Sequence, residues 1–458
     1  MRKPNLVRPL KTALRLLRHT IGGLAVLAFV YALGGLRADH SITRIAHPSL
    51  APSPSTTPGP TQSSNAVALA TSSDDLRPAQ HGPAIAPAAK PRANKTAAGD
   101  IAVALNPGAA SAPAQAPASA PPARSGWAAV APPTSRTGGY IIISRARLAT
   151  LPVTGPAWQG LKAAADASAG TPDLSNMDQN NNVFVLAKAL VYARTGDPRY
   201  RDEVIANLKA AVGTEGGKTL ALGRELGAYA LAADLVDLSV TDPGFDAQTF
   251  RPWLRRLLTL DLGGLTLQTT HEQRPNNWGT QAGASRAAVA AYLGDARELA
   301  RVAQVFKGWL GDRASYAGFN YGDLSWQADP AHPVGINPVG ATIGGVSVDG
   351  ALPEEMRRGG AFKWPPAGTD YPWGALEGAI LQAEILYQAG YDTWNWQNQA
   401  LRRGYEFLFA RAGWGPAGND EWQLWLIDYR YGTGYRRGSP VSPGKNFGWS
   451  DWLYTPGT

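Results

Sequence analysis

Two stretches of this 458-residue chain concentrate side chains that can bind an anion or move a proton. The first holds His271, Asn276, Asn277 and Trp278, directly before a segment with helical periodicity. An Asn at a helix start can be a cap, because its side-chain oxygen accepts a hydrogen bond from a free N–H group. Two adjacent Asn can instead present an amide and the positive end of the helix dipole to an anionic ligand. His271 is either a surface loop histidine or part of that ligand site.

The second stretch is a long segment predicted as a loop, residues 309–370, and it is rich in aromatic residues, Gly and charge. Arg357 and Arg358 follow Glu354 and Glu355 directly in it. The four form either a solvated ion-pair cluster or an arginine fork that recognises a carboxylate. Loops of this length are commonly functional, so the segment is a candidate for one wall of a site.

The same region supplies rings and a second histidine. Trp326, Trp364 and Trp373 are either core residues or platforms for sugar stacking. Tyr371, just before an apolar helix, is a candidate proton-transfer phenol if a cation stabilises its phenolate. His332 is one of two histidines after residue 137, and it is either inert or catalytic.

The elements that must position these residues are predicted to be helices. Turns at Gly196–Asp197–Pro198, Asp242–Pro243–Gly244 and Gly294–Asp295 divide them into helical hairpins, and strands are expected only at 140–143, at 342–348 and near the C-terminus. The predicted class is all-α, as an incomplete (α/α) toroid of hairpins rather than a solenoid, because no fixed repeat is visible. The expected helices are 182–194, 201–212, 219–238, 250–260, 280–293, 296–310, 373–388 and 394–409.

The N-terminal part is predicted to differ in kind. Residues 1–20 are a basic leader expected in the cytoplasm, and residues 21–36 form an apolar run close to the length of a spanning helix, read as an uncleaved signal anchor. A cleaved signal peptide is the alternative. Residues 37–137, rich in Ala, Pro and Ser, cannot bury enough apolar surface to fold and are predicted to be a disordered linker. The folded domain is then 138–458.

Charge and composition exclude several classes of function. Residues 1–137 carry 14 basic and 4 acidic side chains, whereas residues 138–458 carry 29 and 31, so the basic charge is confined to the leader and linker. A nucleic-acid partner is therefore not expected. The chain has no Cys, which excludes disulfides and thiolate metal sites. No set of His or carboxylates has ligand spacing, so neither a metal nor another cofactor is predicted.

Three segments together resemble one family. RPNNWGTQAGASRAAVAAYLGD, DGALPEEMRRG and YPWGALEGAILQAEILYQAGYD are similar to segments of the alginate-lyase superfamily of polysaccharide lyases, including its glucuronan-cleaving relatives, over about residues 175–450. The resemblance implies an incomplete (α/α) toroid that cleaves a uronic-acid polysaccharide by β-elimination. It also implies that Asn277 neutralises the substrate carboxylate, Arg358 supports the site and Tyr371 transfers protons. The family's usual His after the Asn pair is Trp278 here, which makes His332 the natural substitute.

We therefore expect a single-pass inner-membrane protein whose periplasmic domain is a lyase acting on a 4-linked uronate polysaccharide. Its catalytic residues would be Asn277, Tyr371, His332 and Arg358. One alternative is a toroidal glycoside hydrolase, which needs two carboxylates across a cleft. Another is a non-catalytic glycan-binding protein of polysaccharide export. The carboxylate candidates are Asp323, Asp329, Asp349, Glu354 and Glu355, and the predicted substrate-binding residues are Asn276, Trp278, His271, Arg357, Trp326, Trp364 and Trp373.

Overall fold

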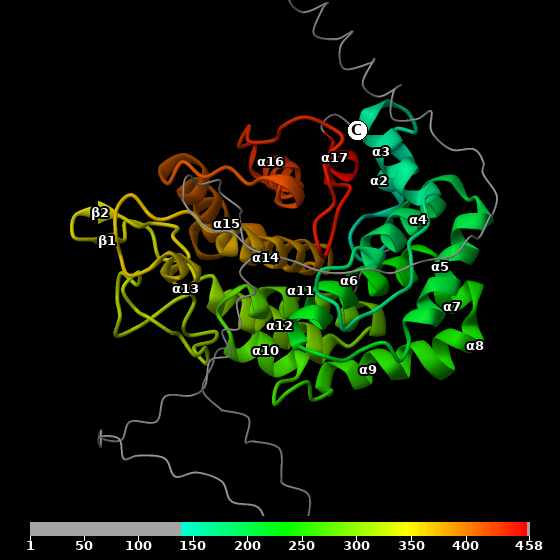
Figure 1. Ribbon diagram of the computed structural model, residues 1–458, viewed down its shortest axis with the longest axis horizontal. Coiled ribbons are helices and arrows are strands. Elements are labelled where there is room, and N and C mark those ends of the chain that lie inside the picture. Colours follow the sequence, from blue (N-terminus) through cyan, green and yellow to red (C-terminus); the bar gives the residue numbers. More distant parts are fainter. Residues whose placement is uncertain (1–138, 456–458) are drawn as a thin grey trace, which may run out of the picture. The chain divides into compact units, whose positions relative to one another are not determined.

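The structure is a computed structural model that describes residues 139–455, and this part of the chain is almost entirely helical (Figure 1). The all-α prediction is confirmed for it. The predicted leader, anchor and linker lie outside the described residues. Within 139–455, no helix combines the length and the apolar character needed to cross a membrane.

The described chain begins with helices that alternate with short turns. In order they are α2 (Arg145–Thr150), α3 (Gly155–Asp166), α4 (Asn181–Thr195), α5 (Pro198–Ala211), α6 (Thr219–Leu235), α7 (Leu238–Thr241), α8 (Pro243–Phe245), the π-helical turn η1 (Asp246–Phe250), α9 (Arg251–Thr259), α10 (Leu267–Gln273), α11 (Asn277–Leu293) and α12 (Ala296–Trp309).

The second half contains a long irregular segment and further helices. The helices are α13 (Pro353–Met356), η2 (Arg357–Gly359), α14 (Tyr371–Gln388), η3 (Thr393–Asn395), α15 (Trp396–Glu406), η4 (Phe407–Arg411), η5 (Gly418–Asp420), α16 (Gln423–Tyr431) and α17 (Ser450–Leu453). A small antiparallel hairpin, β1 (Thr342–Ile343) and β2 (Val346–Ser347), pairs Thr342 with Ser347. The strand predicted at 342–348 is thus a hairpin of two short strands.

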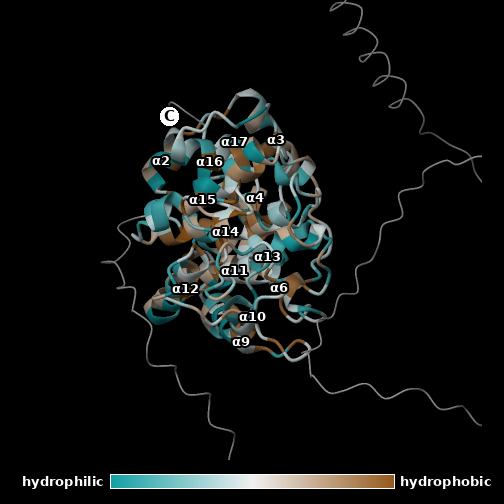
Figure 2. Ribbon diagram, turned by 90° about the vertical axis from the view of Figure 1, so that its left-hand side faces the viewer, coloured by the Kyte–Doolittle hydropathy of each residue, from teal (hydrophilic) through white to brown (hydrophobic). Residues whose placement is uncertain are grey.

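Helices α4, α6, α11 and α14 form the interior, and most of their side chains are buried. Their sequences are rich in Ala, Gly and Leu on every face, which suits a helix that is covered all round. Helices α9 and α12 instead carry separate apolar and charged faces and cover the outside. Figure 2 shows this division as brown ribbon in the interior and teal ribbon on the outer helices.

Glycines bring α6 and α11 into close contact. Gly223 lies against Ala282, and an added Cβ at Gly223 would stand 2.9 Å from the backbone nitrogen of Ala282. Gly227, one turn later, lies against Ser285, whose hydroxyl accepts the Gly227 N–H at 2.7 Å. Because contact positions advance in the same direction along both helices, α6 and α11 run parallel.

Helix α14 packs on the other side of α11 by the same means. A Cβ at Gly378 would lie 2.4 Å from the carbonyl carbon of Thr280, so only Gly fits there. Gly374 lies beside Asn277, and Gln382 lies beside Gly283, which again gives a parallel pair. The N-terminal ends of α6, α11 and α14 therefore face the same end of the molecule.

Each of α4 and α11 is followed by a short turn and a returning outer helix. Gly196 ends α4 in the left-handed region at φ 74°, and Asp197 then caps α5 through the N–H of Arg199. Gly294 ends α11 at φ 67°, and Asp295 caps α12. These turns confirm the predicted hairpins at both places.

The predicted strand 140–143 was wrong, and so were the strands expected near the C-terminus. Residues 140–143 are buried and form an irregular turn. The Tyr140 N–H donates to the carbonyl of Ile143 at 2.9 Å, and the Ile141 N–H donates to the Asp234 carboxylate at 2.6 Å. An apolar run of four residues therefore reflected burial and not strand pairing. Near the C-terminus, the segment where strands were expected, residues 432–449, is irregular and lies between α16 and α17.

The first and last described segments are in contact. The indole N–H of Trp452 donates to the carbonyl of Pro152 at 2.8 Å, and Arg147 donates to the carbonyl of Leu453 at 3.0 Å. The rings of Trp158 and Trp452 lie 5.6 Å apart. Figure 1 accordingly shows α17 beside α3.

Candidate functional site

The two adjacent Asn residues have different roles. Asn276 is the N-cap of α11: its side-chain oxygen accepts the Trp278 N–H at 3.1 Å, and its carbonyl accepts the Thr280 N–H at 3.1 Å. The helix-capping interpretation is thus correct for Asn276. Asn277 is the first residue of α11, and its buried Oδ1 has no hydrogen-bond partner among the described residues. The capping bonds therefore leave the Asn277 side chain available.

Glu355 joins the start of α11 to the arginine pair. The backbone N–H of Asn277 donates to Oε1 of Glu355. The Glu355 residue as a whole is 1% exposed. Oε2 of Glu355 lies 3.8 Å from Nε of Arg358. Burial raises the pKa of Glu355 to about 8, with the nearby Arg358 charge acting in the opposite direction.

Arg358 in turn contacts Tyr371. Its guanidinium lies 4.8 Å from the centre of the Tyr371 ring, within the range of a cation–π contact. Gly374, one turn beyond Tyr371 in α14, lies beside Asn277, because a Cβ there would stand 3.9 Å from Asn277 Nδ2. The structure therefore links Asn277 to Arg358 through Glu355, and Arg358 in turn contacts Tyr371 at the start of α14.

Arg357 points to a different neighbour. It forms an ion pair with Glu354, and the second oxygen of Glu354 accepts the Gly322 N–H at 3.0 Å. The Arg357 guanidinium also packs directly against Gly322. The Glu354–Arg357 pair thus fastens the irregular segment near residue 322, and the four charged residues are two separate pairs rather than one solvated cluster.

His332 lies apart from these contacts. Its side chain is 68% exposed, and Nδ1 is 2.8 Å from a carboxylate oxygen of Asp329. The hydrogen bond lowers the pKa of Asp329. No contact in the described part of the chain links His332 to Asn277, Arg358 or Tyr371.

His271 is not a loop residue, and the prediction that placed it in a loop was wrong. It lies on α10 and is 4% exposed, with Nδ1 3.4 Å from Nη1 of Arg286. Burial lowers its pKa well below the ordinary value, and the Arg286 charge adds to this. Because Arg286 has only N–H donors, Nδ1 of the neutral ring is the acceptor and Nε2 carries the proton.

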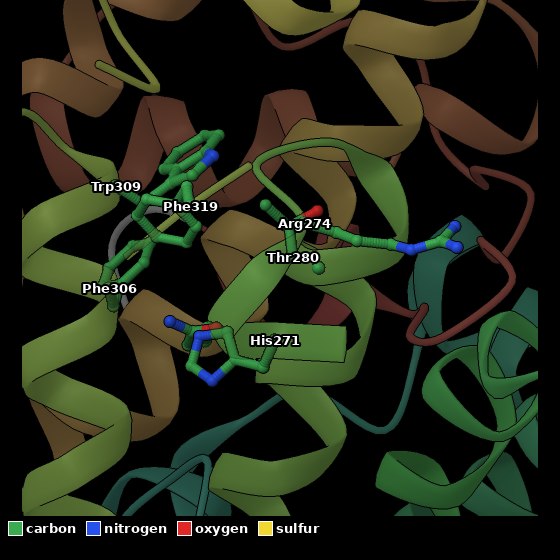
Figure 3. A pocket seen from close by; sticks show the side chains of 8 residues that line it. His271, Arg274, Thr280, Phe306, Trp309 and Phe319 are labelled. Atoms are coloured by element: carbon green, nitrogen blue, oxygen red, sulfur yellow. The ribbon is translucent and has the colours of Figure 1, made fainter. Parts of the chain in front are cut away.

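A small cavity with room for about one water molecule lies beside the His271 ring. Gln382 also lines it, and neither amide atom of Gln382 has a hydrogen-bond partner within the described residues. Figure 3 shows Phe306, Trp309 and Phe319 gathered together, and Arg274 extending away from them. The Arg274 guanidinium lies 4.2 Å from the Trp278 ring.

The three predicted stacking tryptophans are placed differently. Trp326 and Trp373 are core residues: Trp326 packs edge-on against Phe362 at 4.9 Å, and Trp373 against Tyr405 at 5.6 Å. Trp364 is 38% exposed, so of these three only Trp364 offers a ring face to solvent.

The site contains a second group of polar residues that the sequence did not single out. Glu377 of α14 accepts hydrogen bonds from Trp422 Nε1 at 3.0 Å and from Gln281 Nε2 at 3.2 Å. Burial raises the pKa of Glu377, and burial together with the Glu377 charge raises that of Asp420 to about 8. A Glu within the apolar sequence ALEGAILQ was the available signal, because a buried carboxyl needs partners.

This group extends to α6 and α4. The charges of Arg224 and Glu377 interact electrostatically. Burial raises the pKa of Glu225, the residue next to Arg224, to about 9. Asn182 donates to the carbonyls of Arg224 at 3.2 Å and Lys445 at 2.8 Å. The N-terminal halves of the four interior helices thus carry one connected band of polar groups.

The described residues contain no group of three or more His, Asp or Glu side chains placed to hold a metal ion. Comparisons with known proteins add no relative: no family model matches the chain, and no curated protein matches it. Any assignment of function therefore rests on the residues and their geometry.

Proposed function

We propose that the chain is a polysaccharide lyase that cleaves a 4-linked uronic-acid polysaccharide by β-elimination. The observation that supports this most directly is the series of contacts that runs from Asn277 through Glu355 and Arg358 to Tyr371. These residue types meet the needs of the reaction. Elimination removes the weakly acidic C5 proton, stabilises the developing enolate and protonates the departing O4.

Asn277 and Arg358 are assigned to the substrate carboxylate. Asn276 caps α11, so the Asn277 amide is not used as the cap. Arg358 supplies a positive charge next to the other carboxyl oxygen of Glu355. Neutralising the carboxylate withdraws electron density from C5, which makes the proton easier to remove. The acceleration comes from charge stabilisation in a site that is already ordered.

Tyr371 is assigned the proton transfers. It stands at the first position of α14, and the Arg358 guanidinium lies 4.8 Å from the centre of its ring. His332 pairs with Asp329 at the surface and makes no contact with the other three residues of the described site. We therefore rank Tyr371 above His332 as the base.

An incomplete (α/α) toroid is part of the proposal. Parallel neighbours α6, α11 and α14, with returning helices outside them, are what an arc of helical hairpins requires. In such an arc the N-terminal ends of the inner helices form one surface, and the polar band lies on that surface. We also propose that residues 1–137 tether this domain to the inner membrane, with the domain in the periplasm.

The test is the absorbance of reaction products made from alginate, glucuronan and related uronates. A lyase creates a conjugated unsaturated uronate that absorbs in the ultraviolet, whereas a hydrolase creates reducing ends without that absorbance. Asn277→Ala should remove the signal, and Asn276→Ala, the adjacent cap, is the matched control. Reducing ends without absorbance, or binding without either product, would reject the lyase.

A glycoside hydrolase is the second candidate, because of Glu377 and Asp420. Burial raises the pKa of both carboxyl groups, and a raised pKa is what a general acid needs at neutral pH. Glu377 is nevertheless held by Trp422 and Gln281, which suits a fixed structural group. Loss of hydrolysis in Asp420→Asn would favour this alternative.

A further inference from the structure

We propose that Glu355 is a positioning residue that holds Asn277 and Arg358 in one fixed arrangement. The inference rests on the proposed lyase function, and it assigns a role to a residue that would touch no substrate. Each of its two carboxyl oxygens faces a different member of the site: Oε1 accepts the Asn277 N–H, and Oε2 lies 3.8 Å from Arg358 Nε.

The first contact fixes the beginning of α11. The N–H of Asn277 is one of the free donors at a helix start, and Asn276 caps the next residue rather than this one. Glu355 therefore supplies the partner that orients the first residue of the helix, which carries the Asn277 side chain. The bond joins residues 78 positions apart in the sequence.

The second contact fixes the arginine. Arg358 is one helical turn after Glu355, and its Nε is buried with no hydrogen-bond partner in the described part of the chain. At 3.8 Å the two groups are in contact without forming a hydrogen bond. The guanidinium thus stays beside Tyr371 while its donors are not consumed by Glu355.

The charged groups around Glu355 predict how this arrangement responds to pH. They are Arg358, Glu354 and Arg357 from its own segment, with the Asn277 N–H as the neighbour from α11. Burial raises the pKa of Glu355 to about 8. Above that pH the carboxylate neutralises the Arg358 charge, so turnover should fall as pH rises through about 8.

Glu354 provides a matched comparison. It is also buried and paired three residues ahead with an arginine, but its partners are Arg357 and Gly322 rather than the site. Glu354→Ala and Glu355→Ala therefore make the same chemical change in adjacent residues. Only the second should alter catalysis per folded molecule.

The experiment measures steady-state kinetics and hydrogen exchange of the Asn277 amide in the full chain. Glu355→Ala should lower kcat on the order of 100-fold with a smaller change in KM, and should expose the Asn277 amide to exchange. Glu355→Gln keeps an acceptor for that amide, so it should retain protection, lose about 10-fold or less in kcat and lack the fall near pH 8.

Two results would overturn the proposal. One is unchanged Asn277 protection in folded Glu355→Ala, since the amide would then have another partner. The other is an equal loss of kcat in Glu354→Ala and Glu355→Ala. If the wild-type chain forms no unsaturated product, the lyase function fails, while the exchange measurement still decides the contact.

Discussion

Two regions of the described domain differ in whether their buried polar groups have hydrogen-bond partners. One is the N-terminal halves of the interior helices, and the other is the set of ion pairs elsewhere. At the N-terminal halves, Asn182 Oδ1, Glu225 Oε1, Gln281 Oε1 and Asn277 Oδ1 have no hydrogen-bond partner among the described residues. Lys188, by contrast, donates three hydrogen bonds, to two carbonyls and Glu203, at 2.6–2.8 Å. Glu384, fully buried, is bound by Arg430 and Gln388.

The contrast distinguishes fully bonded groups from groups that could bind a ligand under the proposed function. A buried polar group without a partner costs stability, so it persists where something else compensates. A glycan has hydroxyl groups and carboxylates that can supply the missing partners. Under the proposed function, the unpaired atoms at these helix starts are candidate contacts for the glycan; Tyr391, Trp394, Trp425 and Tyr454 also have buried unpaired atoms and lie elsewhere.

The largest effect should come from Tyr371→Phe. Removing the phenol oxygen should abolish formation of unsaturated product and leave glycan binding intact, because ring packing against Arg358 is kept. Product absorbance and a binding isotherm measure the two. His332→Ala should keep most of its turnover; full loss there, with active Tyr371→Phe, would transfer the base to His332.

Among the fully bonded groups, Glu384→Ala should strongly lower the stability of the folded domain. It leaves Arg430 buried without its bidentate partner, and breaking such a pair costs about 3–5 kcal/mol. Urea unfolding gives the free energy. Turnover per folded molecule should be unchanged, and a selective loss of turnover would show that the scaffold and the site are not separate.

Asn277→Ala and Asn276→Ala should have opposite effects although the residues are adjacent. Asn277→Ala should lower turnover on the order of 100-fold with little change in unfolding free energy. Asn276→Ala should cost about 1 kcal/mol of stability and little turnover, since it removes a cap. Rate and urea measurements on both variants test this, and the reverse outcome would exchange the assigned roles.

A further effect on stability alone is expected from helix packing. Gly378→Ala places a methyl group 2.4 Å from Thr280, and overpacking of this kind costs about 1–3 kcal/mol. Gly244→Ala, at a glycine with open space around it, is the control. A neutral Gly378→Ala measured by urea unfolding would mean that α11 and α14 separate easily.

Most helices could be predicted from the sequence, because the apolar periodicity and the Gly–Asp turns are local signals. The predicted helix 182–194 is α4, Asn181–Thr195, and 296–310 is α12, Ala296–Trp309. The amphipathic helix α3, Gly155–Asp166, and α16 were missed. In α16 aromatic and charged residues alternate and resemble the Gly- and Pro-rich sequence that follows.

The site was predictable in part. The resemblance pointed to Asn277, Arg358 and Tyr371, which do meet, but it gave no reason to choose Glu355 as the residue between them. The contact between residue 277 and residue 355 depends on long-range packing, which a sequence pattern does not contain. His271 looked like a loop residue because α10 is only seven residues long and polar.

The contact between α17 and the first described helices has a topological consequence. Because Arg147 and Pro152 bind residues 453 and 452, a short peptide could join the two ends of the folded domain. New ends could then be opened at Gly344–Gly345, the exposed tip of the β1–β2 hairpin. Such a circular permutant would keep every helix intact, and it would attach any fused anchor to the opposite half of the chain.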